Sequence, residues 1–406
     1  MSERHRVRIE RLVAGGDGLG RLGGSRGGRA VFVPYAIPGE TVLIEVVQRR
    51  KDYSRARIAE ILEPSPDRRE AFCSYYGNCG GCRFQHMSYP RQLREKSAIL
   101  QETLRRTGGI DIRDIPAVPS AEQGYRTRVR LHRGAEGRPG FKAARSETVV
   151  TVDRCPVCVE PINRAITSIP LMSTETITLL ASDRGVVSDR SIVVGETAGI
   201  DGPPGANGTA GVWDVSGNRD TATVTVAGRP FHCSPGAFFQ SNLSLLPELV
   251  SCATAGLSGG RLLDLYCGIG LFGGFLADRF DQVVCVDRSA RAVALARKNV
   301  TGAKHRFAAR SVERWAGGNT MRCDAVVVDP ARPGLNPRVI DYLLACGASE
   351  LVYVSCNPAT LARDLAILTR SGGSEPGYTL EQMRLFDFFP QTPHMEIVVR
   401  LGSRGR

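Results

Sequence analysis

Short apolar runs recur through the C-terminal half of the chain, and a polar or glycine-rich segment follows each one. The runs are rich in β-branched residues, which predicts buried strands, and several of the segments between them have helical composition. The runs occupy residues 261–265, 282–286, 325–328, 351–354 and 397–401. This alternation predicts an α/β sheet, and open sheets of that kind bind ligands beyond the carboxyl ends of their strands.

The first 63 residues have a different pattern, with shorter strands and more turn residues. We expect strands at residues 6–12, 30–34, 40–47 and 53–62, which together predict a small β domain. The glycine-rich segment at residues 15–20 resembles a nucleotide-binding loop in composition. No helical pattern follows it, so we interpret it as a turn-rich connection.

The middle of the chain has one predicted helix and a series of predicted strands. Residues 88–108 have apolar positions at helical spacing, and Gly108 and Gly109 end the pattern. Residues 116–232 are expected to be mainly strands, and basic residues alternate with others over residues 125–132, as on a strand with one cationic face. Residues 199–217 are rich in Gly, Pro, Asn and Asp and predict a loop.

Composition and charge limit the kind of protein. A chain of 406 residues is long enough for two or three domains, and a net charge of +12 favours a phosphate-rich partner. No apolar run reaches the length of a membrane span, and the first residues lack the apolar region of a secretory signal, so we expect a cytoplasmic protein. In a reducing compartment, the 12 cysteines favour metal-binding or catalytic roles over disulfides.

Five of these cysteines have the spacing of metal ligands. Cys79 and Cys82 are separated by two glycines, with Cys73 shortly before them, and Cys155 and Cys158 form a second close pair. Two cysteines at this spacing can reach one metal centre, and glycines allow the backbone to fold tightly around it. Spacing alone permits either a zinc site or a four-cysteine iron–sulfur cluster.

A glycine loop follows the strand predicted at residues 261–265. The sequence Asp264-Leu-Tyr-Cys-Gly-Ile-Gly270 lacks the full phosphate-binding fingerprint of dinucleotide enzymes, which suits a ligand without a pyrophosphate. Asp287 ends the next predicted strand, where a carboxylate can bind both ribose hydroxyls of a nucleoside cofactor.

Three further motifs lie beside the last three predicted strands. They are Asp329-Pro-Ala-Arg332, Ser355-Cys-Asn-Pro-Ala-Thr360 and His394-Met-Glu396. Together they resemble the RNA uracil-C5 methyltransferase family, and in particular its 23S rRNA type, which carries a TRAM domain and an iron–sulfur cluster. The resemblance extends over nearly the whole chain and is weakest at about residues 165–228.

The resemblance implies a multidomain fold. Residues 1–63 would form a TRAM domain, an OB-like β-barrel that binds RNA, because Gly16–Gly20, Val31–Pro34 and Pro38–Glu40 match its pattern. Residues 64–235 would form a central β-rich iron–sulfur domain. Residues 236–406 would form a Rossmann-like class I methyltransferase domain that uses S-adenosylmethionine, with the helix at residues 88–108 packed against it.

The resemblance also implies roles for individual residues. Cys356 would be the nucleophile that adds to carbon 6 of uracil, and Glu396 the base that removes the proton from carbon 5. The residues matching cofactor positions are Gln240, Tyr266, Gly268, Gly270, Asp287 and Asp329. The residues matching cluster ligands are Cys73, Cys79, Cys82 and Cys155, which makes Cys158 an additional cysteine without a ligand role.

Several alternatives remain open from the sequence. The RNA substrate is expected to be 23S rRNA, with tRNA as the alternative, and the protein is expected to act as a monomer. A cytosine-C5 methyltransferase would carry a second cysteine in the segment Asp329–Arg332, where this chain has none. A non-catalytic RNA-binding protein of the same fold would not need Cys356 and Glu396.

Overall fold

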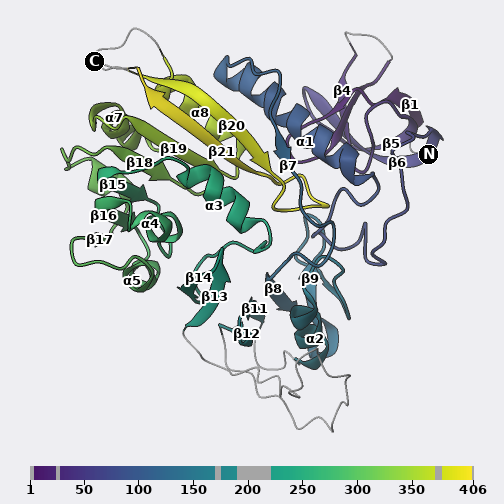
Figure 1. Ribbon diagram of the computed structural model, residues 1–406. Helices are drawn as coiled ribbons and strands as arrows, with labels where there is room; N and C mark the ends of the chain where they lie inside the picture. The colour runs from purple at the N-terminus through teal and green to yellow at the C-terminus, as the bar shows by residue number, and fades with distance from the viewer. Residues whose placement is uncertain (1–3, 24–27, 170–174, 190–220, 371–376, 405–406) are drawn as a thin grey trace.

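The computed structural model describes residues 4–23, 28–169, 175–189, 221–370 and 377–404. The loop predicted at residues 199–217 lies outside the described residues. Figure 1 shows three regions: N-terminal strands on the right, a large sheet with its helices on the left, and a smaller group of strands below. The helix α1 lies between the first two regions.

The N-terminal region is a barrel. Its described strands are ordered β1-β5-β6-β4-β3-β2. The residues predicted as one strand at 6–12 form two, because β1 pairs with β5 whereas β2 pairs with β3, and this switch of partner closes the barrel. β3 lies partly in the segment predicted as a turn. The strands are β1 (Arg4–Arg8), β2 (Arg11–Leu12), β3 (Gly18–Arg21), β4 (Ala30–Val33), β5 (Thr41–Arg49) and β6 (Tyr53–Glu63).

The central region is built on an antiparallel sheet. Its described strands are ordered β10-β9-β8-β11-β12, and a separate hairpin joins β13 to β14. In β8 the buried residues Val129 and Leu131 alternate with basic ones, which confirms the predicted cationic face. The strands are β8 (Arg128–Arg133), β9 (Pro139–Lys142), β10 (Val149–Thr151), β11 (Thr176–Ser182), β12 (Gly185–Ser188), β13 (Ala222–Val226) and β14 (Arg229–Cys233).

The prediction of mainly strands over residues 116–232 was wrong at α2 (Glu160–Ser168). Pro161 lies in the first turn of this helix, where the missing amide hydrogen costs nothing. Ile162 and Ile166 are buried four residues apart on its inner face. A 3₁₀ turn, η2 (Ala135–Gly137), lies between β8 and β9.

The C-terminal region is an α/β sheet whose described strands are ordered β17-β16-β15-β18-β19-β21-β20-β7. Among these described strands, β21 runs antiparallel to both of its neighbours, and the others run parallel to one another. The strands are β7 (Ala117–Val118), β15 (Gly259–Leu265), β16 (Phe280–Asp287), β17 (Arg306–Ala309), β18 (Ala325–Val328), β19 (Glu350–Ser355), β20 (Tyr378–Phe386) and β21 (Glu396–Ser403).

Helices cover both faces of this sheet, and each face has its own apolar core. One core includes Leu265, Val328 and Leu361, and the other includes Leu262, Val327 and Val354. Alternate residues of the same strand therefore point to opposite faces, as expected for a sheet buried on both sides. The helices are α3 (Leu246–Thr254), α4 (Leu271–Leu276), α5 (Ala290–Asn299), α6 (Val312–Ala316), α7 (Pro337–Ala345) and α8 (Pro358–Leu368).

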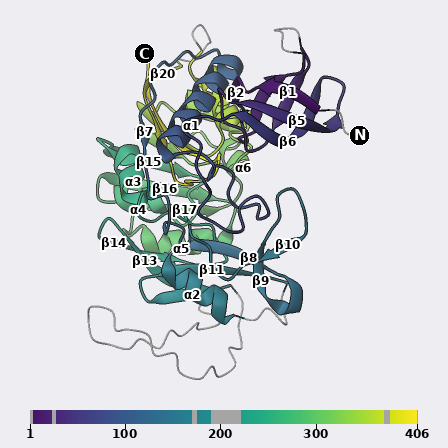
Figure 2. The same ribbon diagram turned by 90° about the vertical axis from the view of Figure 1, so that its right-hand side faces the viewer.

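The helix predicted at residues 88–108 joins the barrel to the C-terminal sheet. It consists of α1 (Tyr89–Thr103) and a π-helical turn, η1 (Leu104–Gly108), and it lies beside the barrel in both Figure 1 and Figure 2. Leu100 and Leu104 share the apolar core that contains Leu361 of α8. Lys96 is fully buried and forms an ion pair of 2.5 Å with Asp387, just after β20. Burying a charge without a partner would be costly, so this pair fixes α1 against the sheet.

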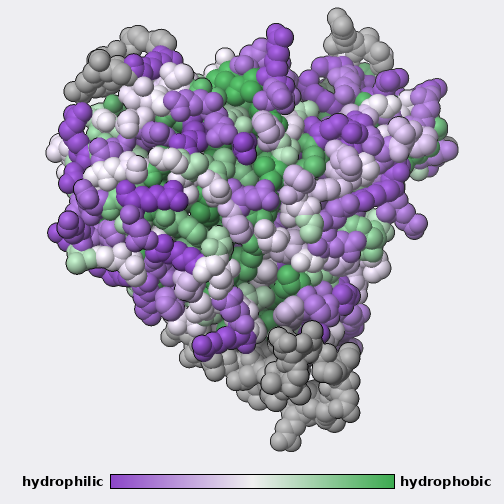
Figure 3. Space-filling view, viewed as in Figure 1, coloured by the Kyte–Doolittle hydropathy of each residue, from purple (hydrophilic) through white to green (hydrophobic). Residues whose placement is uncertain are grey.

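The surface is mostly hydrophilic in the view of Figure 3, and apolar side chains gather toward the middle of that face. Among the described residues, no helix is both long and apolar enough to cross a membrane.

Candidate active site

Four of the predicted site residues lie at the same edge of the C-terminal sheet. Tyr266 directly follows β15, Asp287 ends β16, Asp329 follows β18 and Cys356 follows β19. These strands are parallel and adjacent in the order β16-β15-β18-β19. The structure therefore brings together residues that are up to 90 positions apart in the sequence (266 to 356), at the edge where open α/β sheets bind ligands.

Cys356 lies in a tight turn between β19 and α8. Asn357 caps α8, because its side chain accepts a hydrogen bond from the amide of Ala359, and Pro358 occupies the first turn. Both features end the strand at Ser355 and start the helix at Pro358. Cys356 is half-buried, directly after a strand that is buried from Leu351 to Ser355.

Glu396 faces Cys356 across the pairing of β19 with β21. Ser355 pairs with Ile397 as the last pair of this antiparallel ladder, and Cys356 and Glu396 are the residues directly beyond it on the two chains. The two side chains lie close enough for the charge of Glu396 to raise the pKa of Cys356. Glu396 is 4% exposed, which makes it a buried carboxyl beside a half-buried thiol.

The segment after β18 carries Asp329 and Arg332 to the same place. The amide of Asp329 donates to the carbonyl of Leu265 at 3.3 Å. The carbonyl of Arg332 accepts hydrogen bonds from the Asn357 side chain at 2.8 Å and from the Thr360 hydroxyl at 3.1 Å. The two loops that follow β18 and β19 are thus tied together, and the polar residues of both motifs contribute to that connection.

The electrostatics of this edge are dominated by acids. Burial, followed by the nearby Glu396 and Asp329, raises the pKa of Cys356 to about 11, and the guanidinium of Arg332 opposes that change. Burial and the charge of Asp329 raise the pKa of Glu396 well above its usual value, while Arg332 lowers it. Burial and Asp287 raise the pKa of Asp329 to about 7. A cationic ligand among these groups would lower all three pKa values.

The glycine loop after β15 has a backbone that ordinary residues rarely adopt. Tyr266, Gly268 and Gly270 all have positive φ, of 58°, 52° and 79°. A side chain on Gly270 would approach Val300 to 2.8 Å, so the close packing against α5 requires glycine there. The carboxylate of Asp287 accepts from the amides of Gly268 at 3.0 Å and Ser289 at 2.8 Å, which fixes the loop beside it.

Gln240 brings an unsatisfied polar atom to this region. It lies before α3 and is buried, and its side-chain oxygen has no hydrogen-bond partner among the described residues. Buried polar atoms are normally paired, so an orphaned one supports a ligand at this position.

Two residues before Gln240, Phe238 is 68% exposed, which is unusual for so large an apolar side chain.

Asn299 is a residue of this region that the sequence analysis missed. Its side-chain amide donates to the carbonyl of Ile269 in the glycine loop at 2.8 Å and to the carbonyl of His232 in β14 at 2.9 Å. Its side-chain oxygen accepts from the amide of His232 at 2.7 Å. A buried Asn at the end of a helix gives no sequence signal of its own, because only the fold reveals what it connects.

The four predicted cluster ligands line one cavity of about 260 Å³. Arg126, Arg130 and Lys142 line it as well, so the cationic face of β8 turns toward the cysteines. Within the described ranges, no three His, Cys, Asp or Glu side chains are grouped closely enough to hold a single metal ion. The thiol of Cys158 is hydrogen-bonded to Cys155 and lowers the pKa of Cys155 to about 7.

Comparison with known proteins agrees with this architecture. A family model for tRNA (uracil-5-)-methyltransferases matches residues 308–404, one for a methyltransferase small domain matches residues 231–347, and one for the TRAM domain matches residues 3–59. An uncharacterized RNA methyltransferase of Aquifex aeolicus is 34% identical, with 98% of each chain covered. A 23S rRNA (uracil(1939)-C(5))-methyltransferase of Pseudomonas entomophila is 31% identical over 98% of this chain and 93% of that protein.

The chain belongs to the RNA uracil-C5 methyltransferase family. A solved structure points the same way: a Pyrococcus abyssi tRNA (uracil-54, C5)-methyltransferase in complex with S-adenosyl-L-homocysteine has a TM-score of 0.71 and 26% identity. It covers 98% of this chain and 100% of that one. As a uracil-C5 methyltransferase of this family, the protein has its thiol–carboxyl pair and its glycine loop at one sheet edge.

The acidic surroundings of Cys356 predict how its reactivity depends on pH. Alkylation by iodoacetamide should increase with pH up to about 11, because the thiolate is the reactive form and the pKa of Cys356 is raised to about 11. Asp329→Asn should shift the pH profile of Cys356 alkylation to lower pH, and Arg332→Ala should shift that profile to higher pH. Peptide mass spectrometry can follow each cysteine separately, with Cys252 of α3 as the internal control. Coincident profiles for the three proteins would contradict this electrostatic assignment.

Proposed function

We propose that the protein transfers a methyl group from S-adenosylmethionine to carbon 5 of a uridine in 23S rRNA. The observation that carries this proposal is the pairing of β19 with β21, which ends at Ser355 and Ile397 and so brings Cys356 and the buried carboxyl of Glu396 close together just beyond it. Both lie at the sheet edge that also holds the glycine loop and Asp329. The full-length relative from Pseudomonas entomophila acts on 23S rRNA, which supports this substrate.

The residues along β15 and β16 fit S-adenosylmethionine. Asp287 would bind the ribose hydroxyls, since each of its oxygens accepts one backbone amide and has capacity for a second bond. Gly268 and Gly270 would let the backbone approach the ligand, with Tyr266 beside them, and Gln240 would satisfy its buried oxygen there. When bound, this cofactor supplies a methyl group on a cationic sulfur. Its positive charge suits an edge where Asp287 and Asp329 lie close together.

Carbon 5 of uracil is too weak a nucleophile to take a methyl group directly. In the first step the sulfur of Cys356 forms a bond to carbon 6, and the electron pair of the 5,6 double bond moves toward the carbonyl oxygen to give an enolate. The thiol proton must leave before this bond forms. Asp329 is a neighbouring carboxyl whose charge acts on the Cys356 thiol, and we assign it that proton.

After methyl transfer, carbon 5 carries both the new methyl group and its original proton. Glu396 removes this proton, the electron pair re-forms the 5,6 double bond, and the bond between carbon 6 and the sulfur breaks. The net change replaces one hydrogen by one methyl group and releases one proton. Burial suits Glu396 to this task, because a raised pKa makes its carboxylate a stronger base.

The target uridine has to reach these groups outside a base-paired helix, either in a single-stranded segment or after being flipped out. Phe238 is an exposed aromatic ring two residues from Gln240, where it can stack on a base of the RNA. tRNA is the second candidate substrate, because the solved relative that covers 98% of this chain acts on tRNA. The protein would act as a monomer in the cytoplasm.

We also propose that Cys73, Cys79, Cys82 and Cys155 hold a 4Fe-4S cluster. Their shared cavity of about 260 Å³ supports this assignment, because all four cysteines line it. A single zinc ion would require four ligands at about 2.3 Å from a common centre. The positive charges of Arg126, Arg130 and Lys142 suit an anionic cluster bound by four thiolates.

The role of Glu396 can be tested by changing it to Gln, which keeps the size of the side chain and removes the base. Thiol addition and methyl transfer precede proton removal, so Glu396→Gln should accumulate a protein–RNA adduct that carries the methyl group and survives denaturation. Denaturing gels with a radiolabelled methyl donor measure it. Turnover of Glu396→Gln at the rate of the unchanged protein would assign the base to another residue.

Two control variants make this experiment specific. Cys356→Ala should form no adduct, because the attacking atom is absent, and the double variant should behave like Cys356→Ala. The half-buried Cys252 of α3 gives a matched control, since Cys252→Ala removes a thiol outside the site and should leave turnover unchanged.

The cluster assignment predicts a colour that depends on particular cysteines. Protein purified without oxygen should be brown and contain iron and acid-labile sulfide, and Cys82→Ser should bleach it. Cys158→Ser should keep the colour, because a hydroxyl can still donate a hydrogen bond to the sulfur of Cys155. Colourless protein with one zinc ion per chain would contradict the cluster.

A further inference from the structure

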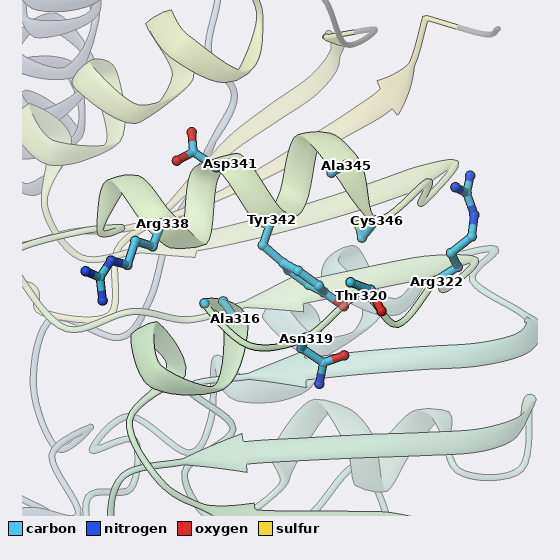
Figure 4. A pocket seen from close by; sticks show the side chains of 10 residues that line it. Ala316, Asn319, Thr320, Arg322, Arg338, Asp341, Tyr342, Ala345 and Cys346 are labelled. Carbon is cyan, nitrogen blue, oxygen red and sulfur yellow. The ribbon is translucent and has the colours of Figure 1, made fainter.

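The structure contains a second cavity, between α6 and α7, that the proposed chemistry does not use. Its volume is about 830 Å³, and it is lined by Asn319, Thr320, Arg322, Arg338, Asp341 and Tyr342 among others. Tyr342 is buried and forms the floor, because its ring packs on Trp315 at 5.3 Å and its hydroxyl donates to the carbonyl of Met321 at 2.7 Å. Figure 4 shows Arg338 and Arg322 at opposite ends, with Tyr342 between them.

The two arginines of this cavity are exposed and carry uncompensated charge. Neither guanidinium forms a hydrogen bond or an ion pair with any other residue that the structure describes. Elsewhere in the same sheet arginines are paired, as Arg400 is with Glu350 at 2.6 Å. Asp341 also lines the cavity, and it forms no ion pair with either arginine. The cavity therefore offers two free cationic ends above a rigid floor.

Further positive charge extends from this cavity toward the catalytic edge. Arg310 follows the carboxyl end of β17, and Arg314 lies on α6 beside the cavity. Both are exposed, and within the described ranges neither side chain is part of an ion pair. Unneutralised arginines that continue along a surface are the usual footprint of a nucleic-acid backbone.

The cavity runs between the two edges of the sheet. α7 starts after the loop that carries Asp329 and Arg332, so Arg338 in its first turn is near the catalytic edge. Arg322 precedes β18 and is therefore near the opposite edge. The nine residues of α7 span about 14 Å at about 1.5 Å each. That length matches roughly four stacked nucleotides at about 3.4 Å each.

We propose that this cavity is a groove for the phosphodiester backbone of the RNA substrate, on nucleotides that flank the target uridine. The proposal rests on the methylation of RNA proposed above and adds a contact surface to it. Arg338 and Arg322 would each bind a phosphate through two parallel hydrogen bonds, which guanidinium groups form readily. Asn319 and Thr320 would bind sugar or phosphate oxygens between them. Such contacts fix the position of the strand and do not read its sequence.

The test compares RNA binding of the unchanged protein with that of the double variant Arg322→Ala, Arg338→Ala. The probe is 23S rRNA transcribed in vitro, and the dissociation constant is measured over a range of salt concentrations. Losing two phosphate contacts should make the plot of the logarithm of the association constant against the logarithm of salt concentration less steep, by about 1.4 to 2. Relative to 1 M salt, the same slopes give roughly a 15- to 45-fold loss of affinity at about 0.15 M salt. The KM for RNA should rise by a comparable factor, whereas kcat at saturating RNA should not change.

Two sets of controls decide between a groove and a general effect of charge. Arg322→Lys, Arg338→Lys keeps both charges and should keep most of the slope. Arg370→Ala, Arg384→Ala removes two exposed arginines, located after α8 and in β20, whose side chains form no hydrogen bond or ion pair with another described residue; it should leave the slope unchanged.

An unchanged slope in the Ala pair would overturn the proposal, even if the cavity bound a small polyanion such as pyrophosphate. An equal loss in the control pair or in the Lys pair would overturn it as well. These outcomes are distinct from failure of the proposed function, in which the unchanged protein itself would leave the RNA unmethylated.

Discussion

The active edge depends on one constraint, which is that β21 runs antiparallel between β19 and β20. A strand that entered parallel to β19 would have its start at the opposite edge of the sheet. Because β21 enters at the catalytic edge, its first residue, Glu396, lies one position beyond Ile397, the residue paired with the end of β19 at Ser355. Glu396 then belongs to the sheet, and Cys356 lies in the tight turn directly after a paired strand, so both are positioned by rigid elements.

A second consequence of this geometry is an excess of acid at one place. Asp287 raises the pKa of Asp329, and Asp329 raises the pKa of Glu396. Glu396 and Asp329 both raise the pKa of Cys356. Arg332, in the loop after β18, lowers the pKa of Cys356 and of Glu396. Buried carboxyls raise the pKa of their neighbours until a cation joins them. In the proposed reaction, a methyl donor that carries a positive charge would therefore lower the pKa of the Cys356 thiol as well as supply the methyl group. The same loops that hold these acids are tied together through the carbonyl of Arg332.

Sequence reasoning predicted the elements around this edge well, because each has a local signal. The strands before Tyr266, Asp329 and Cys356 are short apolar runs, and the motif around Cys356 contains its own helix cap, Asn357-Pro358. What could not be predicted were contacts made by residues far apart in the chain, such as Asn299 with the glycine loop and Lys96 with Asp387. The helix α2 was missed although Ile162 and Ile166 have helical spacing. The segments on either side of it have strand-like patterns, so the whole region was predicted to be mainly strands.

The central claim is that Cys356 bonds to the same uracil from which Glu396 later removes a proton. RNA containing 5-fluorouridine tests it directly in the unchanged protein, because fluorine at carbon 5 cannot be removed as a proton is. After incubation with methyl donor, digestion with protease and nuclease, and mass spectrometry, the account predicts one modified peptide, linked through Cys356 to a nucleotide that carries both fluorine and a methyl group. A linkage through another cysteine, or complete methyl transfer with no linked peptide, would contradict it.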